Sequence, residues 1–479
     1  MSPIQQLFLG TGAGGATSYW ITSMGGSGTL DRWYDCSIDS SDNIFVSGNT
    51  TSNVTGYAGL VAKFDTDGAV VWQRDLDDTT NSGNQLFVGG GIAGTTTGNA
   101  SEMVYHFGNS GYNNIGGLGA RYLNDGTIQN NFRLNDSQTD NMYPDGVDVF
   151  GPANTSGNTQ SAYTRVAITG HMAYGSGAYR GFLFVRNNSF QVIEDVAFQH
   201  PSSSGTTTEF KRVLFDTSSA TDANGTGAKI IVTGFRGGGI TTNSNNLWIA
   251  SLTTGSGTGI QSPLAVSWQK EITASPFGSP ADMALDSSGN IYLCGFVYDW
   301  SVGPVPQIYK LNSSGVIQWQ KKISGWSYAR CITPDSSGNV YIGGQYSNNA
   351  WLMKLDSSGS TVWQREIDGI KSGAQNQEVI FRAIKLNSKG DIILSGWTGV
   401  TDAGGNKNTF LMKYPSDGSI TGTFGGVWVI SSLSDTVSNT SFGITASNLS
   451  KNSPTITDTD SNALTDAATS FTPSLTTIS

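Results

Sequence analysis

The residue types that most often carry enzyme chemistry are few in this chain and lie far apart. Three histidines occur among 479 residues, at His106, His171 and His200. None belongs to a nucleophile motif, and no Gly-x-Ser-x-Gly turn is accompanied by a supporting histidine and aspartate. A histidine outside such a pattern is usually a solvated or hydrogen-bonded structural side chain. The sequence therefore predicts no catalytic residues and a protein that is not an enzyme.

The cysteines and the acidic turns were the other candidates for chemistry. Cys36, Cys294 and Cys331 show no Cys-x-x-Cys spacing, which disfavours zinc, and we expect buried, reduced thiols. Asp65-Thr-Asp67-Gly68, Asp39-Ser-Ser-Asp42-Asn43 and residues 458–462 resemble partial calcium loops but lack the further ligands and the closing glutamate. We interpret them as turns, with weak calcium sites as the alternative, and predict no metal site and no cofactor.

Aromatic residues near the long connections are candidates for stacking on sugar rings. Loops on a rigid scaffold are where recognition tends to occur. Aromatic side chains are more often part of the core than of a ligand site, so contact with a ligand is the less favoured interpretation for any one of them. The candidates are Tyr112, Tyr174, Trp300 and Trp397.

A repeated unit organises most of the chain. Its clearest copy is Asp286-Ser-Ser-Gly-Asn-Ile-Tyr-Leu-Cys-Gly295, a polar turn followed by a short apolar segment that ends in glycine. Three middle copies keep only the apolar segment and its glycine. Units of this length are typical of β-propeller blades. The segment-ending glycines, 49 to 64 residues apart, are Gly48, Gly108, Gly170, Gly234, Gly295, Gly344 and Gly396.

Each unit predicts four strands separated by turns. The second strand is apolar without alternation, as expected of a sheet covered on both faces, and its glycine should let neighbouring backbones approach closely. The predicted fold class is all-β, a seven-bladed β-propeller of four-stranded antiparallel blades with N- and C-terminal extensions. A Trp-Gln-[Arg/Lys] motif marks the fourth strand at Trp72, Trp268, Trp319 and Trp363.

The two ends of the chain receive separate predictions. Tyr19-Trp20-Ile21 resembles the fourth-strand motif and precedes the first full unit, so we expect residues 17–24 to complete the last blade. The predicted domains are an N-terminal anchoring extension (1–16), the propeller (17–430) and a Ser/Thr/Asp-rich C-terminal extension (431–479). The composition of the last segment predicts disorder or ordering by a partner.

Charge and hydropathy exclude several classes of partner. The net charge is −10 and no cluster of Lys and Arg is present, which argues against nucleic acid and against anionic lipid. The sequence contains no run of about 18 apolar residues, so insertion into a membrane is not predicted. The first residues lack the basic and apolar regions of an export signal, so export is not expected.

Two resemblances extend this interpretation. The unit Asp286–Gly295 and its copies, over about residues 17–425, resemble the bacterial β-propeller repeat family of large surface and secreted proteins. That family implies a propeller and no fixed activity. The start, Ser2-Pro-Ile-Gln-Gln-Leu-Phe-Leu-Gly-Thr-Gly-Ala13, and the end, with Leu464-Thr-Asp-Ala-Ala-Thr-Ser470, resemble the ends of virion structural proteins of marine tailed phages, notably cyanophages.

The second resemblance implies a non-enzymatic phage virion structural protein, tail-associated or capsid-displayed, which assembles in the host cytoplasm. Ile4, Leu7, Phe8 and Leu9 would dock onto other virion proteins, and exposed loops would bind a host cell-surface glycan or protein. A bacterial surface or secreted adhesin is the first alternative. A propeller glycan lyase or hydrolase is the second, and it would need carboxylates, histidines or a metal converging at the ring centre.

Overall fold

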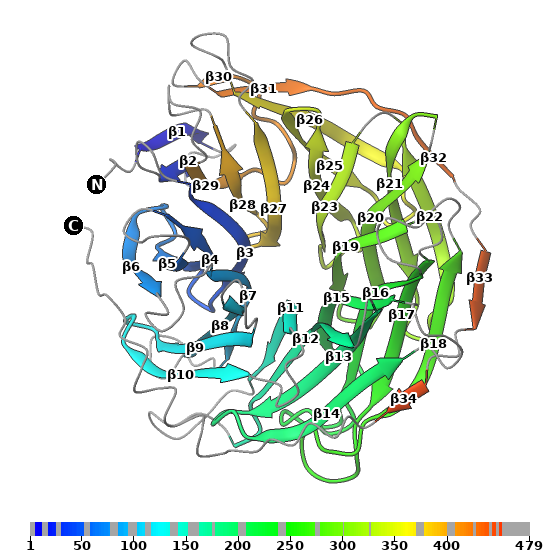
Figure 1. Cartoon of the computed structure of the whole chain (residues 1–479). Coiled ribbons are helices and arrows are strands. Elements are labelled where there is room, and N and C mark those ends of the chain that lie inside the picture. Colours follow the sequence, from blue (N-terminus) through cyan, green and yellow to red (C-terminus); the bar gives the residue numbers. More distant parts are fainter. Residues whose placement is uncertain are drawn as a thin grey trace.

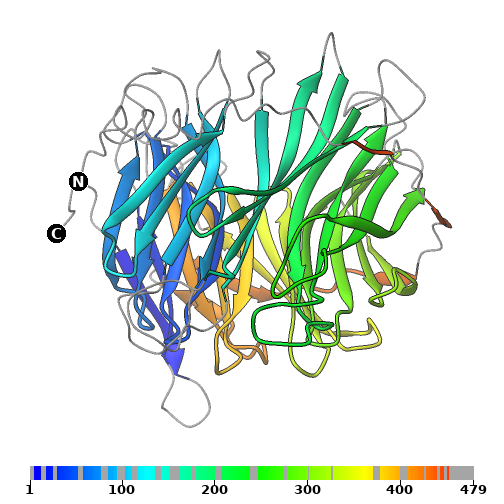
Figure 2. The same cartoon turned by 90° about the horizontal axis from the view of Figure 1, so that it is seen from below.

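The chain folds into a closed ring of seven β-sheets around a central axis (Figure 1). We call the space along this axis, where the first strands line cavities, the channel. This computed structural model describes residues 5–11, 18–24, 30–51, 58–76, 85–93, 103–110, 116–134, 142–151, 162–174, 178–199, 207–237, 246–273, 278–299, 301–324, 327–369, 378–399, 408–424, 428–439, 443–446 and 450–452. The sheets stand side by side about one axis, as the view along the perpendicular direction also shows (Figure 2). The predicted seven-bladed propeller is confirmed.

Each blade is an antiparallel sheet whose first strand faces the channel and whose fourth strand is outermost. Blade 1 comprises β3 (Arg32–Ile38), β4 (Ile44–Thr50), β5 (Ala58–Phe64) and β6 (Val70–Leu76). Blade 2 comprises β7 (Gln85–Ala93), β8 (Met103–Ser110), β9 (Gly116–Leu123) and β10 (Ile128–Leu134). Blade 3 comprises β11 (Met142–Phe150), β12 (Arg165–Tyr174), β13 (Ala178–Asn187) and β14 (Val192–Gln199). Blade 4 comprises β15 (Thr207–Asp216), β16 (Lys229–Gly237), β17 (Asn246–Thr253) and β18 (Ala265–Thr273).

The remaining blades follow the same order. Blade 5 comprises β19 (Gly278–Leu285), β20 (Ile291–Asp299), β21 (Gly303–Leu311) and β22 (Ile317–Ile323). Blade 6 comprises β23 (Ser327–Pro334), β24 (Val340–Tyr346), β25 (Asn349–Leu355) and β26 (Thr361–Gly369). Blade 7 contains β27 (Val379–Leu386), β28 (Ile392–Thr398) and β29 (Asn408–Tyr414).

The ring closes through a strand from the other end of the chain. Strand β2 (Ser18–Met24) pairs antiparallel with β29 and is the fourth strand of blade 7, which confirms the prediction for this segment. Strand β1 (Gln5–Thr11) then pairs with β2 as a fifth strand. Closure in this manner ties the first and last blades together by backbone hydrogen bonds, so the ring has no unprotected end blade.

The second strands are buried on both faces, as their unbroken apolar pattern predicts. Every residue of β4 and of β28 is buried. Each of these strands is covered by the neighbouring blade on either side, and apolar clusters bridge adjacent blades. Burial between sheets thus supplies the main stabilisation of the ring.

The four repeated tryptophans of the fourth strands form hydrogen bonds from blades 1, 4, 5 and 6 to the blade that follows each of them. The indole Nε1 of Trp363 in blade 6 donates to the carbonyl of Ser416 in blade 7, at 3.2 Å. Equivalent bonds join Trp72 to Asn124 O, Trp268 to Ser313 O and Trp319 to Ser357 O. Each indole therefore satisfies its polar atom while it buries its ring.

The segment after β29 runs around the outside of the ring. Strands β30 (Gly422–Phe424) and β31 (Trp428–Ser432) extend blade 6, where β31 pairs with β26. Strands β32 (Val437–Asn439), β33 (Gly443–Ala446) and β34 (Ser450–Asn452) then pair with the outermost strands of blades 5, 4 and 3 in turn. We call residues 428–452 the strap, which appears in orange and red at the periphery (Figure 1).

The strap corrects the expectation of disorder for this part of residues 431–479. Its anchoring to blade 6 is specific, because the amide of Gln364 accepts from Asp435 N and donates to Asp435 O, both at 2.8 Å. The outer edge of a blade presents unpaired backbone groups that an extended segment of almost any composition can satisfy. Composition alone could not reveal this pairing.

Candidate functional site

A β-bulge at the same place in every innermost strand shapes the channel. In each blade one residue of the first strand is skipped in the pairing with the second strand, for example between Trp33 and Asp35 in β3 and between Phe381 and Ala383 in β27. The same register shift occurs in the other five first strands. A bulge adds a residue that is free of the ladder and re-aims its side chain.

The repeat glycines make these bulges fit. Each glycine pairs with the residue just before the bulge, as Gly396 does with Phe381. A Cβ added at Gly396 would lie 1.9 Å from the carbonyl oxygen of Ile380, and one at Gly48 would lie 1.8 Å from that of Arg32. This confirms that the glycines permit close backbone approach. The residues from which the blade count was predicted are therefore also the ones that shape the channel.

Six of the skipped residues line one cavity of about 360 Å³. We call this cavity the arginine chamber, because arginines from blades 4, 6 and 7 meet there. The other lining residues come from β15, β19 and β20. The whole lining consists of Tyr34, Asp145, Lys211, Arg212, Ser279, Pro280, Ala281, Phe296, Arg330 and Arg382.

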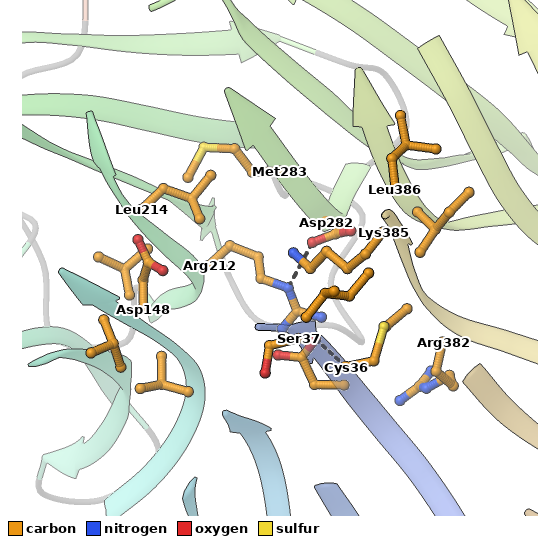
Figure 3. A pocket seen from close by; sticks show the side chains of 17 residues that line it. Cys36, Ser37, Asp148, Arg212, Leu214, Asp282, Met283, Arg382, Lys385 and Leu386 are labelled. Atoms are coloured by element: carbon orange, nitrogen blue, oxygen red, sulfur yellow. Dashed lines mark hydrogen bonds and ion pairs between the residues drawn. The ribbon is translucent and has the colours of Figure 1, made fainter. Parts of the chain in front are cut away.

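A second cavity of about 300 Å³ adjoins it and shares Arg212 and Arg382 (Figure 3). We call it the central chamber. Asp35, Asp148 and Asp282 supply its carboxylates, and Lys385 supplies a further positive charge. Desolvation raises the pKa of Asp35 and of Asp148 above the ordinary value. Burial lowers the pKa of Lys385, but Asp35 and Asp282 raise it more, so the net shift is upward and the ammonium is retained.

Several charged groups of the central chamber hold the inner strands together. Asp148 Oδ2 accepts from Phe215 N at 2.7 Å, which joins blades 3 and 4. Asp282 Oδ1 accepts from Arg212 Nε at 3.1 Å, and its Oδ2 accepts from Ile332 N at 3.0 Å, which joins blades 4, 5 and 6. Carboxylates committed in this manner act as structural groups, since each satisfies a donor that would otherwise be buried without a partner.

A compact ionic cluster lies on one side of the arginine chamber. Lys211 Nζ lies 3.2 Å from Asp145 Oδ2 and 3.0 Å from Glu209 Oε2. His171 Nδ1 is 2.8 Å from Asp145 Oδ2, and its ring stacks on Tyr143 with centroids 4.8 Å apart. Burial raises the pKa of Asp145, but Lys211 and His171 lower it more, so this carboxyl is ionised. The structure thus brings one histidine and two carboxylates close to the ring centre.

Two arginines of the same chamber have no such partner. Within the described residues, no carboxylate lies within ion-pair distance of Arg330 or Arg382. Arg330 donates from Nη2 to Gln345 Oε1 at 3.3 Å, and its Nε is buried without a hydrogen bond. The guanidinium of Arg382 stacks on Tyr34 and Trp397, 5.2 Å and 5.0 Å from the ring centroids. Burial, followed by the charge of Arg330, lowers the pKa of Arg382 to about 10.

The structure places only some of the remaining histidine and aromatic candidates. His106 is buried, and burial lowers its pKa to about 3, so the ring is neutral. Trp397 belongs to the wall around Arg382. Tyr174 lies in β12. His200, Tyr112 and Trp300 lie outside the described residues.

The N-terminal docking residues are only partly described. Ile4 lies outside the described residues, and Leu7 and Phe8 lie in β1. Leu9 is 5% exposed and belongs to the apolar cluster of blades 6 and 7, so its side chain is already covered by the chain itself. Docking through this segment stays a prediction.

The acidic turns at Asp39 and Asp65 and the three cysteines have the structural roles that were predicted, whereas residues 458–462 lie outside the described residues. Asp65 Oδ1 accepts from the backbone N of Asp67 and of Ala69, and Asp39 Oδ1 accepts in the same pattern from two residues of its own turn. Cys36, Cys294 and Cys331 are free and buried. Burial, with the nearby Asp35, raises the pKa of the Cys36 thiol to about 12, so it stays protonated.

Two further properties concern the described part of the chain only. Among its histidines, cysteines and carboxylates, no group of three or more is arranged to hold a metal ion. No helix there has the length and apolar character needed to span a membrane.

Comparison with known proteins finds only distant structural similarity and leaves the function open. No family model matches the chain, and no curated sequence is significantly similar to it. Among solved structures, the Dos1 propeller has 10% identity and a TM-score of 0.41, covering 81% of this chain and 93% of its own. The periplasmic gluconolactonase PpgL of Pseudomonas aeruginosa has 10% identity and a TM-score of 0.39, with coverages of 89% and 100%. The PilY1 C-terminal domain from the same organism has 11% identity and a TM-score of 0.38, covering 76% and 92%.

All three scores are below 0.5, so the assignment as a propeller rests on the strand topology described above. Neighbours with such low identity carry no activity over to this chain. The functional argument must therefore come from the channel and from the ends of the chain.

Proposed function

We propose that this chain is a non-enzymatic structural protein of a tailed-phage virion, tail-associated or capsid-displayed, whose propeller binds the host surface. The observation that supports the non-enzymatic part is that the carboxylates of the channel are already held by hydrogen bonds and ion pairs within the protein. Asp148 and Asp282 hold backbone groups of neighbouring blades, and Asp145 and Glu209 are paired with Lys211. Groups held in this manner stabilise the ring and are poorly suited to exchange protons with a substrate.

The virion part of the proposal is supported by the ends of the sequence. Residues 2–13 and 464–470 resemble the ends of virion structural proteins of marine tailed phages. A closed ring in which the strap covers the outer edges of blades 3 to 6 also suits a particle that must persist outside a cell. In this proposal the protein assembles in the host cytoplasm and docks onto another virion protein through Ile4, Leu7 and Phe8.

Purified particles of a phage that encodes the chain provide the test. Mass spectrometry of banded particles is expected to find this protein at a fixed copy number relative to the major capsid protein. Replacing Ile4 and Phe8 with aspartate should leave a folded propeller that is missing from particles, whereas the matched exposed change Val71→Asp should leave incorporation unchanged. Particles that lack the wild-type protein would overturn the virion role.

One observation favours a second candidate, a propeller lyase or hydrolase that acts on glycans. His171 and Asp145 lie 2.8 Å apart beside a cavity, and the ring of Tyr179 lies edge-on to His171 with centroids 5.0 Å apart. A histidine held by a carboxylate can act as a general base. Release of new reducing ends or unsaturated products from host polysaccharide by wild-type protein, with loss of that activity in His171→Gln, would establish this candidate. A bacterial surface adhesin would instead be found on the cell envelope.

A further inference from the structure

The arginine chamber contains more positive charge than its own carboxylates neutralise. Lys211 is paired with Asp145 and Glu209, and Arg212 is paired with Asp282. Arg330 and Arg382, from blades 6 and 7, add two further charges. A positively charged cavity in a chain of net charge −10 is therefore a local feature and does not follow from composition.

The two arginines occupy equivalent positions in neighbouring blades. Each is the residue skipped at the bulge of its first strand, Arg330 in β23 and Arg382 in β27. Their like charges disfavour each other, which is one of the causes that lower the pKa of Arg382 to about 10. Keeping two partly buried guanidinium groups together costs stability unless an anion joins them.

Aromatic rings cover the faces of both guanidinium groups and leave their edges available. The guanidinium of Arg330 lies 4.4 Å from the ring centroid of Tyr328. Arg382 lies near both Tyr34 and Trp397, and Arg32 approaches Trp397 at 5.4 Å. The donors of a guanidinium lie in its plane, so stacking on the face holds the group in place without using the N–H groups that can bind an oxyanion.

Glu378 is the carboxylate whose charge acts on Arg330, but it does not form an ion pair with this guanidinium. Glu378 raises the pKa of Arg330 slightly against the larger lowering by burial, but it is bonded to Gln345 Nε2 at 3.3 Å. Gln345 Oε1 in turn accepts from Arg330 Nη2, and Arg330 Nε remains buried without a hydrogen bond within the described residues. Arg382 forms no hydrogen bond with the described residues, and it lines the cavity, so its N–H groups can bind an anion that the chain itself does not supply.

We propose that the arginine chamber binds the oxyanion of an acidic sugar residue, a uronate carboxylate or a sugar sulfate, between Arg330 and Arg382. Guanidinium groups bind such oxyanions through paired, charge-assisted hydrogen bonds. The volume of about 360 Å³ is sufficient for one or two sugar rings, and Tyr34 and Phe296 offer apolar walls for their faces. Ser279 and the ionic cluster around Asp145 line the remainder and can bind hydroxyl groups.

The site would serve the proposed host-surface binding, but it is a property of the folded chain and does not depend on the virion role. Its test therefore uses the purified full-length protein and measures binding alone. Incorporation into particles is a separate measurement, so the failure of either proposal can be recognised without the other.

Isothermal titration with four saccharides of equal length tests the chemistry: a trigalacturonate, a sulfated galactose trimer, a neutral galactose trimer and a neutral trimer that carries a terminal phosphate. We expect saturable binding of the uronate or the sulfated trimer with a Kd below about 1 mM, and at least tenfold weaker binding of the neutral trimer. Whichever of the first two binds more tightly identifies the source of the oxyanion. Equal binding of the neutral trimer, binding of the phosphate alone, or no saturable binding would overturn the proposal.

Substitutions locate the binding site. Arg330→Gln and Arg382→Gln are each expected to weaken binding at least tenfold. Arg382→Lys should give an intermediate loss of affinity, because lysine keeps the positive charge but lacks the paired N–H donors of the guanidinium. Lys389→Gln removes one exposed charge on a turn of blade 7 and should change the Kd less than twofold. Both glutamine variants should melt within about 2 °C of the parent, since each relieves like-charge repulsion. Unchanged affinity in both glutamine variants would place the ligand elsewhere and refute the site.

Discussion

Replacing Gly396 with alanine tests the link between the repeat glycine and the channel. Gly396 pairs with Phe381 beside the bulge that contains Arg382. An added Cβ would lie 1.9 Å from the carbonyl oxygen of Ile380, whereas real Cβ atoms essentially never approach closer than 3.0 Å. Strands β27 and β28 must therefore move apart by about 1 Å, which is more than a ladder hydrogen bond tolerates. Two buried bonds lost at about 1.5–2.5 kcal/mol each predict a destabilisation of about 3–5 kcal/mol.

Gly390→Ala is the matched control on the same blade. Gly390 has a φ of +81° and nothing within 4 Å of the added Cβ, so alanine meets only the left-handed backbone strain of about 1–2 kcal/mol. For a chain of 479 residues, an unfolding entropy of roughly 2.1 cal/mol/K per residue means that about 1 kcal/mol shifts the Tm by about 1 °C.

Differential scanning calorimetry should find a fall of about 3–5 °C for Gly396→Ala and about 1–2 °C for Gly390→Ala. Gly396→Ala should also weaken binding of the acidic trimer, because the displaced bulge carries Arg382. Equal shifts in the two variants, or a smaller shift for Gly396→Ala, would refute the assignment of the glycine to close backbone approach.

Three further changes test other parts of the ring. Trp363→Phe removes the donor to Ser416 O and should lower the free energy of unfolding by about 1–3 kcal/mol in a urea titration, while an unchanged midpoint would argue against the lock between blades. Truncation after Phe424 removes the strap and should speed proteolysis and lower the Tm with the circular-dichroism spectrum of a propeller retained; a protease resistance equal to that of the full chain would contradict its role. Desolvation raises the folded pKa of Asp148, so the native state binds more protons and stability falls as the pH rises from the ordinary aspartate value through the raised one. Asp148→Asn should therefore raise the Tm at pH 7 and lose this advantage below about pH 4, and a constant difference from pH 3 to pH 7 would refute the shift.

The ring was predictable because several sequence features recur at the same places along the chain. The turn carboxylates, the Trp-Gln motif and the glycine recur in most blades, so one pattern supports another. Trp20 could be assigned to the last blade because it repeats the fourth-strand motif ahead of the first unit, and Gly68 of blade 1 packs against its indole.

The chambers could not be predicted in the same way. The skipped residue is arginine in blades 6 and 7 and a different residue in each of the other blades, so no residue type common to all units marks it, and the overall acidity conceals the local positive charge. A positional signal does exist, because Tyr34, Ala281, Arg330 and Arg382 each stand fourteen residues before their repeat glycine. In blades 2, 3 and 4 the connection between the first two strands is longer and the count no longer holds. The strap was missed because its pairing depends on edges that are created only when the ring has formed.

The course of the strap bears on how long the native state survives. The strap pairs with the outermost strands of blades 6, 5, 4 and 3 in turn, which is the reverse of the order in which the chain forms these blades. Separation of two of these sheets must therefore disrupt the packing between the blades and the pairing with the strap at the same time. Such an arrangement raises the activation barrier to unfolding more than it raises equilibrium stability, and the half-life of the intact molecule is set by that barrier.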